Sequence, residues 1–303
     1  MNLSPAETRL AYGLLFLTPL LFSANALTAR WVGDSLPPVA MAFWRWTLTL
    51  VFLFPYAGRE FFAGWRDLAR EWRVLLLLGF LGMGVCGAPV YMGARTTSAT
   101  NIGLIYAMTP ILVVVISWLG WRETVTRRQV VGIVLAMFGV LGIIARGDPT
   151  FIFDLRFVPG DFLILSAATA WALYSVVLKH RPSRQPMVAR FIGIVIAGLV
   201  VMLPFYGIEL ALGERMPLDG RTVVVLLVLA LVSGIGAFLA YGKLVAMVGP
   251  QRTGLLMYLG PIYIAVFAWL LLGETIETYH YAGTVLILGG IALATVAPRK
   301  PQG

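Results

Sequence analysis

Side chains that could carry out covalent or metal chemistry are scarce in this sequence. The single cysteine, Cys86, lies in an apolar stretch, so no disulfide can form within the chain. His180 and His280 are a hundred residues apart, and neither has a cysteine or a group of acidic residues nearby, so a metal site is not expected. A Ser/His pair, paired intramembrane carboxylates and a His-x-x-x-His site are not found either. We therefore expect no enzymatic activity and no cofactor.

Aromatic rings, phenols and one amide inside apolar stretches are the groups suited to binding a ligand. Rings offer π-faces to an apolar group, and phenols donate hydrogen bonds to a carboxylate. Trp171 and Tyr174 lie in the middle of their segment, not at its ends, where aromatic belts occur. Asn25 would be costly facing lipid and should face other helices, where it binds either a substrate or a backbone carbonyl. The candidate binding residues are Asn25, Tyr91, Tyr106, Trp171, Tyr174, Tyr241 and Tyr258.

Four of these tyrosines share a local pattern in pairs. Tyr91 and Tyr241 each end a stripe of small residues at helical spacing, which is typical of close helix packing but is also compatible with a gate or a cavity wall. Tyr106 and Tyr258 each precede a proline, Pro110 or Pro261, by three or four residues. A proline inside a helix removes a backbone donor and kinks the helix, so we expect both prolines to be structural hinges.

The amino-acid composition indicates the environment in which these residues lie. Of the 303 residues 59% are hydrophobic and 12% are charged, and the mean hydropathy is +0.87. Soluble domains carry roughly 25% charged residues, so a soluble globular domain is excluded, and so is a disordered chain. The sequence predicts an integral membrane protein of the all-α class, because its apolar runs are far longer than a barrel strand.

Ten apolar segments can be delimited, each close to the roughly 20 residues that span a bilayer. They cover residues 11–31, 37–56, 74–93, 98–119, 129–145, 160–179, 187–207, 222–242, 253–272 and 279–297. The connections are short, and a short interfacial helix is predicted between Phe61 and Trp72, where arginines alternate with large rings.

The basic residues are distributed unevenly between alternate connections. With the N-terminus inside, sixteen Lys and Arg fall on the inner side and six on the outer side, and Arg45 lies within the second segment. This bias predicts that both termini are cytoplasmic. It also explains the net charge of +9 without nucleic acid as a partner. For Arg45 we expect a structural role, in which it snorkels, binds a carbonyl or reaches water.

The chain contains an internal repeat. Shifting residues 98–139 by 151 positions gives thirteen identities, among them Pro110 with Pro261 and Glu123 with Glu274. Two units of five helices follow, residues 1–147 and 148–303. Because five is odd, the second unit is inverted in the membrane, with Glu123 and Glu274 on opposite faces. Inverted repeats let one central site open alternately to either side.

These features resemble the drug/metabolite transporter superfamily. The motif Pro-(x)7-Trp-Leu-(x)3-Glu-Thr closes each repeat, and residues 98–124 and 249–275 are both similar to the most characteristic stretch of EamA-type exporters. Within the superfamily, the sequence most resembles the YddG-type amino-acid exporters of bacterial inner membranes. The resemblance implies a central cavity lined by the first, third, fourth, sixth, eighth and ninth segments, with the fifth and tenth packing the halves together.

The scarcity of intramembrane charge narrows the expected substrate. No acidic residue lies between Glu7 and Asp34, so the carboxylate on which the small multidrug transporters depend is missing. Few intramembrane bases also argue against phosphorylated substrates. We expect an alternating-access exporter of aromatic and other neutral amino acids or related small metabolites. Efflux of drugs, purines or other amphipathic metabolites is the alternative. The expected partners are this small molecule and membrane lipids, and a monomer is the expected state.

Overall fold

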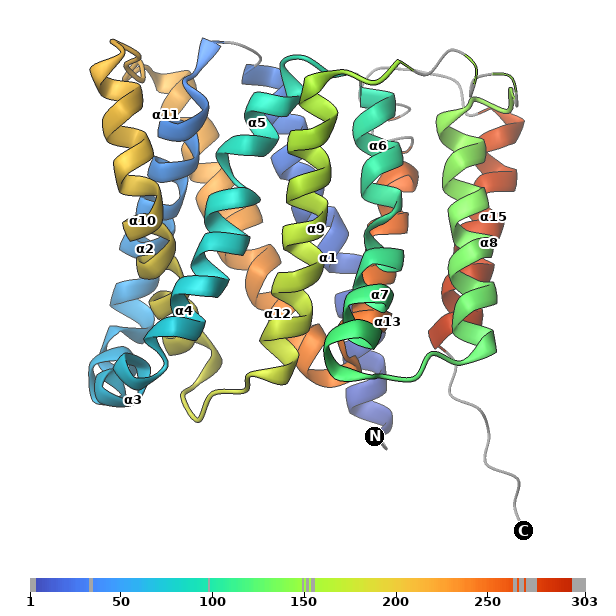
Figure 1. The fold of residues 1–303 in the computed structure, drawn as a ribbon, viewed down its shortest axis with the longest axis horizontal. Helices are drawn as coiled ribbons and strands as arrows, with labels where there is room; N and C mark the ends of the chain where they lie inside the picture. The colour runs from blue at the N-terminus through green and yellow to red at the C-terminus, as the bar shows by residue number, and fades with distance from the viewer. Residues whose placement is uncertain are drawn as a thin grey trace.

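The computed structural model describes residues 4–32, 35–97, 99–148, 150, 153, 156–263, 266, 270 and 277–295. Throughout this part of the chain the regular structure is helical, as the apolar runs predict. The long helices stand side by side and run between two faces of the molecule (Figure 1). α1 begins and α15 ends at the same face, which we call the N-terminal face; the other is the opposite face.

The first half contains five helical passages, of which the third and fourth are broken into shorter pieces. Its elements are α1 (Pro5–Val32), α2 (Pro38–Ala63), α3 (Trp65–Arg70), α4 (Trp72–Gly79), η2 (Phe80–Val85), α5 (Ala88–Ala94), α6 (Ala99–Ala107), α7 (Thr109–Trp121) and α8 (Arg127–Ile144). The short helix α3 lies within the stretch where an interfacial helix is predicted; its place at the membrane surface stays a prediction. α2 extends seven residues beyond the predicted end at 56, because the helix continues through Pro55.

The second half repeats this order. Its elements are α9 (Pro159–His180), α10 (Met187–Ala211), α11 (Gly220–Val228), η4 (Leu229–Gly236), α12 (Ala237–Val248), α13 (Pro250–Gly254), η5 (Leu255–Leu259) and α15 (Thr278–Thr295). Seven of the twenty residues of the ninth predicted segment, 253–272, lie outside the described residues, and so does Glu274.

Local sequence signals set several helix starts. Proline occupies the first position of α2 and of α9, where its missing N–H costs no hydrogen bond. α8 begins with a capping box, in which Thr126 and Gln129 each satisfy the other's backbone N–H. These signals determine where the preceding connections end and where these three helices begin.

Seven of the described helical passages are long and apolar enough to cross a membrane. α1, with 28 residues, and α15, with 18, run beside them, and the passage that begins at α13 completes the set. The chain is thus an all-α membrane protein with ten transmembrane helices, as predicted.

The contact between α8 and α15 shows how the halves are related. A Cβ placed on Gly132 would lie 2.5 Å from the carbonyl oxygen of Gly290, and one on Gly139 would lie 2.6 Å from that of Gly283. The repeat pairs Gly132 with Gly283 and Gly139 with Gly290, so exchanging the halves maps this contact onto itself. Because α8 and α15 run in opposite directions, the two-fold axis lies in the membrane plane and the repeat is inverted (Figure 1).

The helix irregularities follow the same symmetry. The π-helical segments η2 and η4 lie at equivalent places in the third and eighth passages. The fourth passage breaks at Met108, and the ninth contains the 3₁₀ segment η5. Pro110 and Pro261 directly follow these two irregular stretches. Each proline thus follows an irregular stretch of helix; a kink at the prolines and their use as hinges stay predictions.

Candidate functional site

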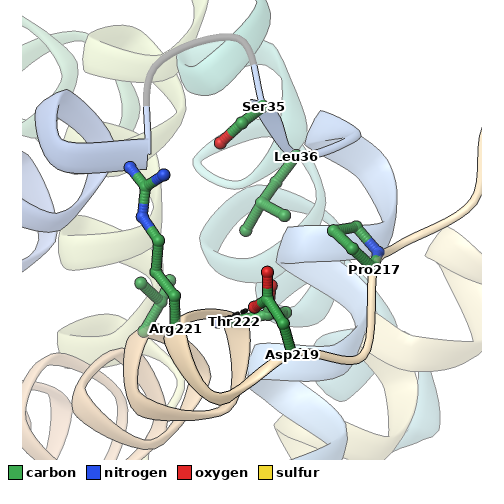
Figure 2. A pocket seen from close by; sticks show the side chains of 7 residues that line it. Ser35, Leu36, Pro217, Asp219, Arg221 and Thr222 are labelled. Atoms are coloured by element: carbon green, nitrogen blue, oxygen red, sulfur yellow. Dashed lines mark hydrogen bonds between the residues drawn. The ribbon is translucent and has the colours of Figure 1, made fainter.

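One small cavity opens at the opposite face, between the start of α2 and the start of α11 (Figure 2). Its volume is about 60 Å³, whereas ligand pockets usually span roughly 300–1,000 Å³. Asp219 in its wall accepts a hydrogen bond from the backbone N–H of Thr222 at 2.7 Å and so caps α11. This bond holds the pKa of Asp219 below its usual value. The cavity is too small for a metabolite, and the residues around it serve to start a helix.

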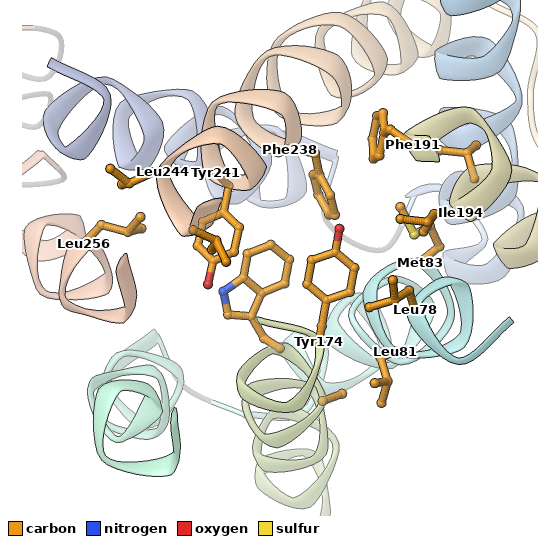
Figure 3. Close-up of a cluster of buried hydrophobic side chains, with 14 of the residues drawn as sticks. Leu78, Leu81, Met83, Tyr174, Phe191, Ile194, Phe238, Tyr241, Leu244 and Leu256 are labelled. Atoms are coloured by element: carbon orange, nitrogen blue, oxygen red, sulfur yellow. The ribbon is translucent and has the colours of Figure 1, made fainter. Parts of the chain in front are cut away.

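A cluster of aromatic rings lies among buried side chains of both halves; Figure 3 shows its members Tyr174, Phe238 and Tyr241. Trp171 of α9 stacks on Tyr174, with ring centroids 5.3 Å apart, and lies 4.6 Å from the ring of Tyr241 on α12. Phe22 of α1 meets Trp171 edge-on at 5.3 Å, and Phe238 of α12 does the same at 5.3 Å. Three of the predicted binding residues, Trp171, Tyr174 and Tyr241, are thus brought together. We call these five rings the aromatic cluster.

α2 and α10 also reach this centre, which the resemblance had not implied. Trp46 of α2 packs edge-on against Phe238 at 4.9 Å, and Phe191 of α10 stacks on Phe238 at 5.7 Å. The second and seventh passages therefore share the central packing with those that the resemblance placed there.

A hydrogen bond between hydroxyl groups closes the aromatic cluster on one side. Ser175 Oγ and Tyr241 Oη share a short hydrogen bond, and Ser175 also donates to the carbonyl oxygen of Trp171 at 2.6 Å. Ser175 and Tyr241 are fully buried. Their polar atoms are satisfied by each other and by the helix backbone, as buried hydroxyls require.

A second polar group lies between α1, α2 and α5, and it contains Asn25 and Tyr91. Tyr91 Oη donates to Asn25 Oδ1 at 2.7 Å. Arg45 Nη1 donates to both, at 2.9 Å to Asn25 Oδ1 and at 2.8 Å to Tyr91 Oη. Only 3% of Arg45 is exposed. The structure thus joins two predicted binding residues through an arginine that sequence reasoning had assigned a structural role. We call these three residues the arginine cluster.

The two polar groups lie at neighbouring places in the two repeats. An offset of 150 residues relates Tyr91 to Tyr241, whereas matching Arg30 with Lys179 relates Asn25 to Tyr174, the residue before Ser175. In each half a tyrosine of the third or eighth passage bonds to a polar side chain of the first or sixth. Both packing and a cavity role stay compatible with this arrangement.

Tyr106 and Tyr258 lie apart from the aromatic cluster. Tyr106 packs against a separate group formed by Ile105, Ile164 and Ala168. Tyr258 is fully buried in the main core, and its hydroxyl has no hydrogen-bond partner. A buried hydroxyl without a partner is costly, so the burial of this phenol needs compensation from the packing around it.

The halves also meet at the N-terminal face. His180 at the end of α9 lies with Nε2 2.8 Å from Glu123 Oε1 and stacks on Trp121. Gln251 at the start of α13 donates to Glu123 Oε2 at 3.0 Å. Glu123 of the first half therefore holds two residues of the second.

A comparable contact closes the opposite face. Asp161 at the start of α9 accepts hydrogen bonds from Asn101 and Thr97 of the first half and from the backbone N–H of Val158. Asn101, near the start of α6, donates to Asp161 at 2.9 Å and to the carbonyl oxygen of Arg156 at 2.9 Å. In this conformation, contacts at both faces therefore join the two halves.

Within the described ranges, His, Cys, Asp and Glu side chains form no group of three that could hold a metal ion. The chemistry that this centre offers is binding through aromatic faces, hydroxyls, one amide and one guanidinium.

A family model describes both halves of this arrangement. The model of the EamA-like transporter family matches residues 9–145 and again residues 158–296. The chain belongs to the EamA-like transporter family. It is a multi-pass membrane transporter of the EamA type, and the resemblance to the drug/metabolite transporter superfamily is confirmed.

Relatives of this EamA-like transporter include proteins named for amino acids. A probable amino-acid metabolite efflux pump of Salmonella typhimurium is 30% identical over 56% of this chain and 58% of its own length. A probable terminal-alkyne amino-acid exporter of Streptantibioticus cattleyicolor is 26% identical over 75% of this chain and 74% of its own. An uncharacterized transporter of Bacillus subtilis is 25% identical over 75% and 74%.

A solved structure supports the fold. It is 19% identical, covers 94% of this transporter and 96% of its own chain, and superposes with a TM-score of 0.74. At this identity the likeness concerns the arrangement of helices alone.

Sequence reasoning missed the part that Arg45 plays in the centre. One signal was present: Arg45 is the single charged residue of an apolar run, and an arginine side chain that faces lipid is energetically costly. Its two partners come from other helices, 20 and 46 residues away in the chain, so spacing along one helix could not reveal them.

Proposed function

We propose that this transporter exports aromatic and other neutral amino acids, or related small metabolites, by alternating access. Two relatives with printed names that refer to amino acids support the substrate class. The alternative is efflux of drugs, purines or other amphipathic metabolites. No enzymatic activity, cofactor or nucleic acid belongs to this proposal.

The observation that carries the proposal is the aromatic cluster. Its rings come from both repeats, Phe22 from the first and Trp171, Phe238 and Tyr241 from the second. A change in the relative position of the halves must separate or rearrange these rings, which opens a space lined by π-faces. Such a space suits an aromatic or aliphatic side chain, and the hydroxyls suit the polar head of an amino acid.

In this scheme the residues take the following roles. Asn25, Tyr91, Tyr106, Trp171, Tyr174, Tyr241 and Tyr258 form the wall of the binding site when it opens. Pro110 and Pro261 act as hinges at the helix breaks. The repeats correspond to residues 1–147 and 148–303.

The contacts at the two faces act as alternating gates. Glu123 with His180 and Gln251 holds the N-terminal face, and Asp161 with Thr97 and Asn101 holds the opposite face. Each set joins the two halves, so one set must release while the other stays closed. We place the chain in the bacterial inner membrane with both termini cytoplasmic, working as a monomer among its lipids.

Purified protein in liposomes tests the proposal. Uptake of labelled amino acids, purines and quaternary amines is measured under defined pH gradients. We expect transport of aromatic and neutral amino acids. Transport of purines or quaternary amines with no amino-acid transport would support the alternative and refute the proposal.

Trp171→Ala tests the wall role with the same assay. Loss of a contacting ring should cost about 1–3 kcal/mol of binding for the substrates that touch it, and therefore change selectivity. Tyr258→Ala serves as a second ring variant. An equal proportional loss for every substrate, normalised to folded protein, would instead assign these rings to packing.

A further inference from the structure

Arg45 is a buried cation that lacks an anionic partner. It lies seven residues into α2, in a membrane-spanning helix, and 3% of it is exposed. In the described part of the chain no carboxylate lies within ion-pair distance of it. Arg190, the other buried arginine of this part, contrasts with it, because Arg190 Nε lies 3.6 Å from Glu71 Oε2. An uncompensated charge in a membrane helix is expensive, and such residues usually serve a function.

Hydrogen bonds orient the guanidinium of Arg45, but not all of its N–H groups have a partner. Nη1 donates to Asn25 Oδ1 and Tyr91 Oη, while Nε is buried without a hydrogen-bond partner. The ring of Trp46 lies 4.5 Å from the guanidinium carbon and covers one side of it. Asn25 Oδ1 therefore accepts two hydrogen bonds, from Arg45 and from Tyr91, at a place where the oxygen of a ligand carboxylate could accept the same two.

The arginine cluster adjoins the aromatic cluster. Phe22 lies three residues before Asn25 on α1 and so on nearly the same helix face. Trp46, next to Arg45, packs on Phe238. A ligand with its carboxylate at Arg45 would consequently have aromatic faces beside it for an apolar side chain.

We propose that Arg45, together with Tyr91, binds the carboxylate of the transported substrate, with Asn25 Oδ1 holding that position in the closed conformation. This inference rests on the proposed function and narrows it to small monocarboxylates with an apolar or aromatic group, amino acids among them. Amphipathic cations are disfavoured, because a cation would approach the unpaired charge of Arg45.

Four related probes separate the carboxylate from the rest of the molecule: L-phenylalanine, L-phenylalaninamide, phenethylamine and 3-phenylpropionate. Transport is measured in liposomes by competition with labelled L-phenylalanine, and binding is measured in nanodiscs by tryptophan fluorescence. The wild type should favour the two carboxylates. Arg45→Gln should lose about 10- to 100-fold of this preference, as expected for a hydrogen bond to a charged group. Arg70→Gln, the same change at an exposed arginine, should keep it.

Asn25→Asp keeps the test valid if Arg45→Gln does not fold. The new carboxylate lies where Asn25 Oδ1 bonds Arg45, so it should pair with the arginine, leave the fold intact and compete with carboxylate substrates. A stable Asn25→Asp protein that still favours carboxylates as the wild type does would overturn the inference.

These experiments distinguish failure of the carboxylate site from failure of the proposed function. If amino acids are transported but the preference for carboxylates is absent, or survives Arg45→Gln, the inference fails and the proposed function stands. If no amino acid is transported, the proposed function fails, and the binding of 3-phenylpropionate decides the inference. Binding that depends on Arg45 supports the carboxylate site, and no binding refutes it.

Discussion

In the first half of the transporter Tyr91 bonds to Asn25, and in the second half its repeat counterpart Tyr241 bonds to Ser175, one residue beyond the counterpart of Asn25. Both residues of the first pair also accept a hydrogen bond from Arg45. When Phe43 of α2 is matched with Phe191 of α10, the counterpart of Arg45 is Gly193, which has no side-chain donor. Matched tyrosines thus make a hydrogen bond in each half, and a charged side chain joins the bonded pair in the first half only. If the proposed carboxylate site is correct, this asymmetry would give the ligand one orientation within two otherwise similar repeats.

Introducing a carboxylate into each pair should produce the largest difference in stability between the two halves. Ser175→Asp buries an acid whose neighbours are a phenol and a backbone carbonyl, which should cost about 3–5 kcal/mol of stability. Asn25→Asp places the acid beside Arg45 and should keep or raise the melting temperature. Thermal unfolding of both variants in the same detergent checks the difference, and equal losses in both would contradict it.

Glycine substitutions in the contact between α8 and α15 test the symmetry of that contact. A Cβ on Gly132 would lie 2.5 Å from a backbone oxygen of α15, so Gly132→Ala should cost about 1–3 kcal/mol by overpacking. Gly283→Ala, its repeat counterpart, should cost a similar amount. Gly142→Ala on the same helix α8 meets nothing within 4 Å and should be neutral or slightly stabilising. Unfolding midpoints that place Gly142→Ala with the other two would refute this contact.

Removal of one hydroxyl from each pair sharpens the comparison. Tyr91→Phe takes an acceptor from a buried cation, and hydrogen bonds to charged groups contribute about 1.5–3 kcal/mol. Tyr241→Phe removes a neutral bond, and Ser175 keeps its bond to the carbonyl oxygen of Trp171, so about 1 kcal/mol should be lost. We expect Tyr91→Phe to be the less stable variant in the same unfolding assay. The reverse order would show that Arg45 does not strengthen the first pair.

The smallest effect is expected where the third and eighth passages start. α11 is capped by the side chain of Asp219, whereas α4 has no side-chain cap at Glu71. Asp219→Ala should lower the melting temperature slightly at neutral pH. Because the folded pKa of Asp219 lies below its ordinary value of 3.8, the stabilisation is complete above that pH and is lost as the pH falls through the folded pKa. The gap between wild type and variant should therefore close in acid; a gap that is unchanged there would exclude the carboxylate as its cause.

The sequence by itself determined the membrane class, the ten helices and the inverted repeat. Apolar runs must be helical in lipid, because every backbone group needs an internal partner, and an odd number of helices in each repeat forces the inversion. Position within a segment indicated that Trp171 and Tyr174 lie away from the membrane interfaces, and a stripe of small residues singled out Tyr241. The structure brings the three into one cluster.

Only the tertiary structure decided which polar groups meet. Spacing along a helix shows which residues share a face, but not the depth or rotation at which another helix presents its own face. Arg45 contacts Asn25 and Tyr91 because three helices converge on one point, and Tyr106 lies outside the aromatic cluster because α6 directs it toward Ile164 and Ala168 of α9. Packing between helices, to which distant parts of the chain contribute, therefore turned a lone arginine into the centre of a polar cluster.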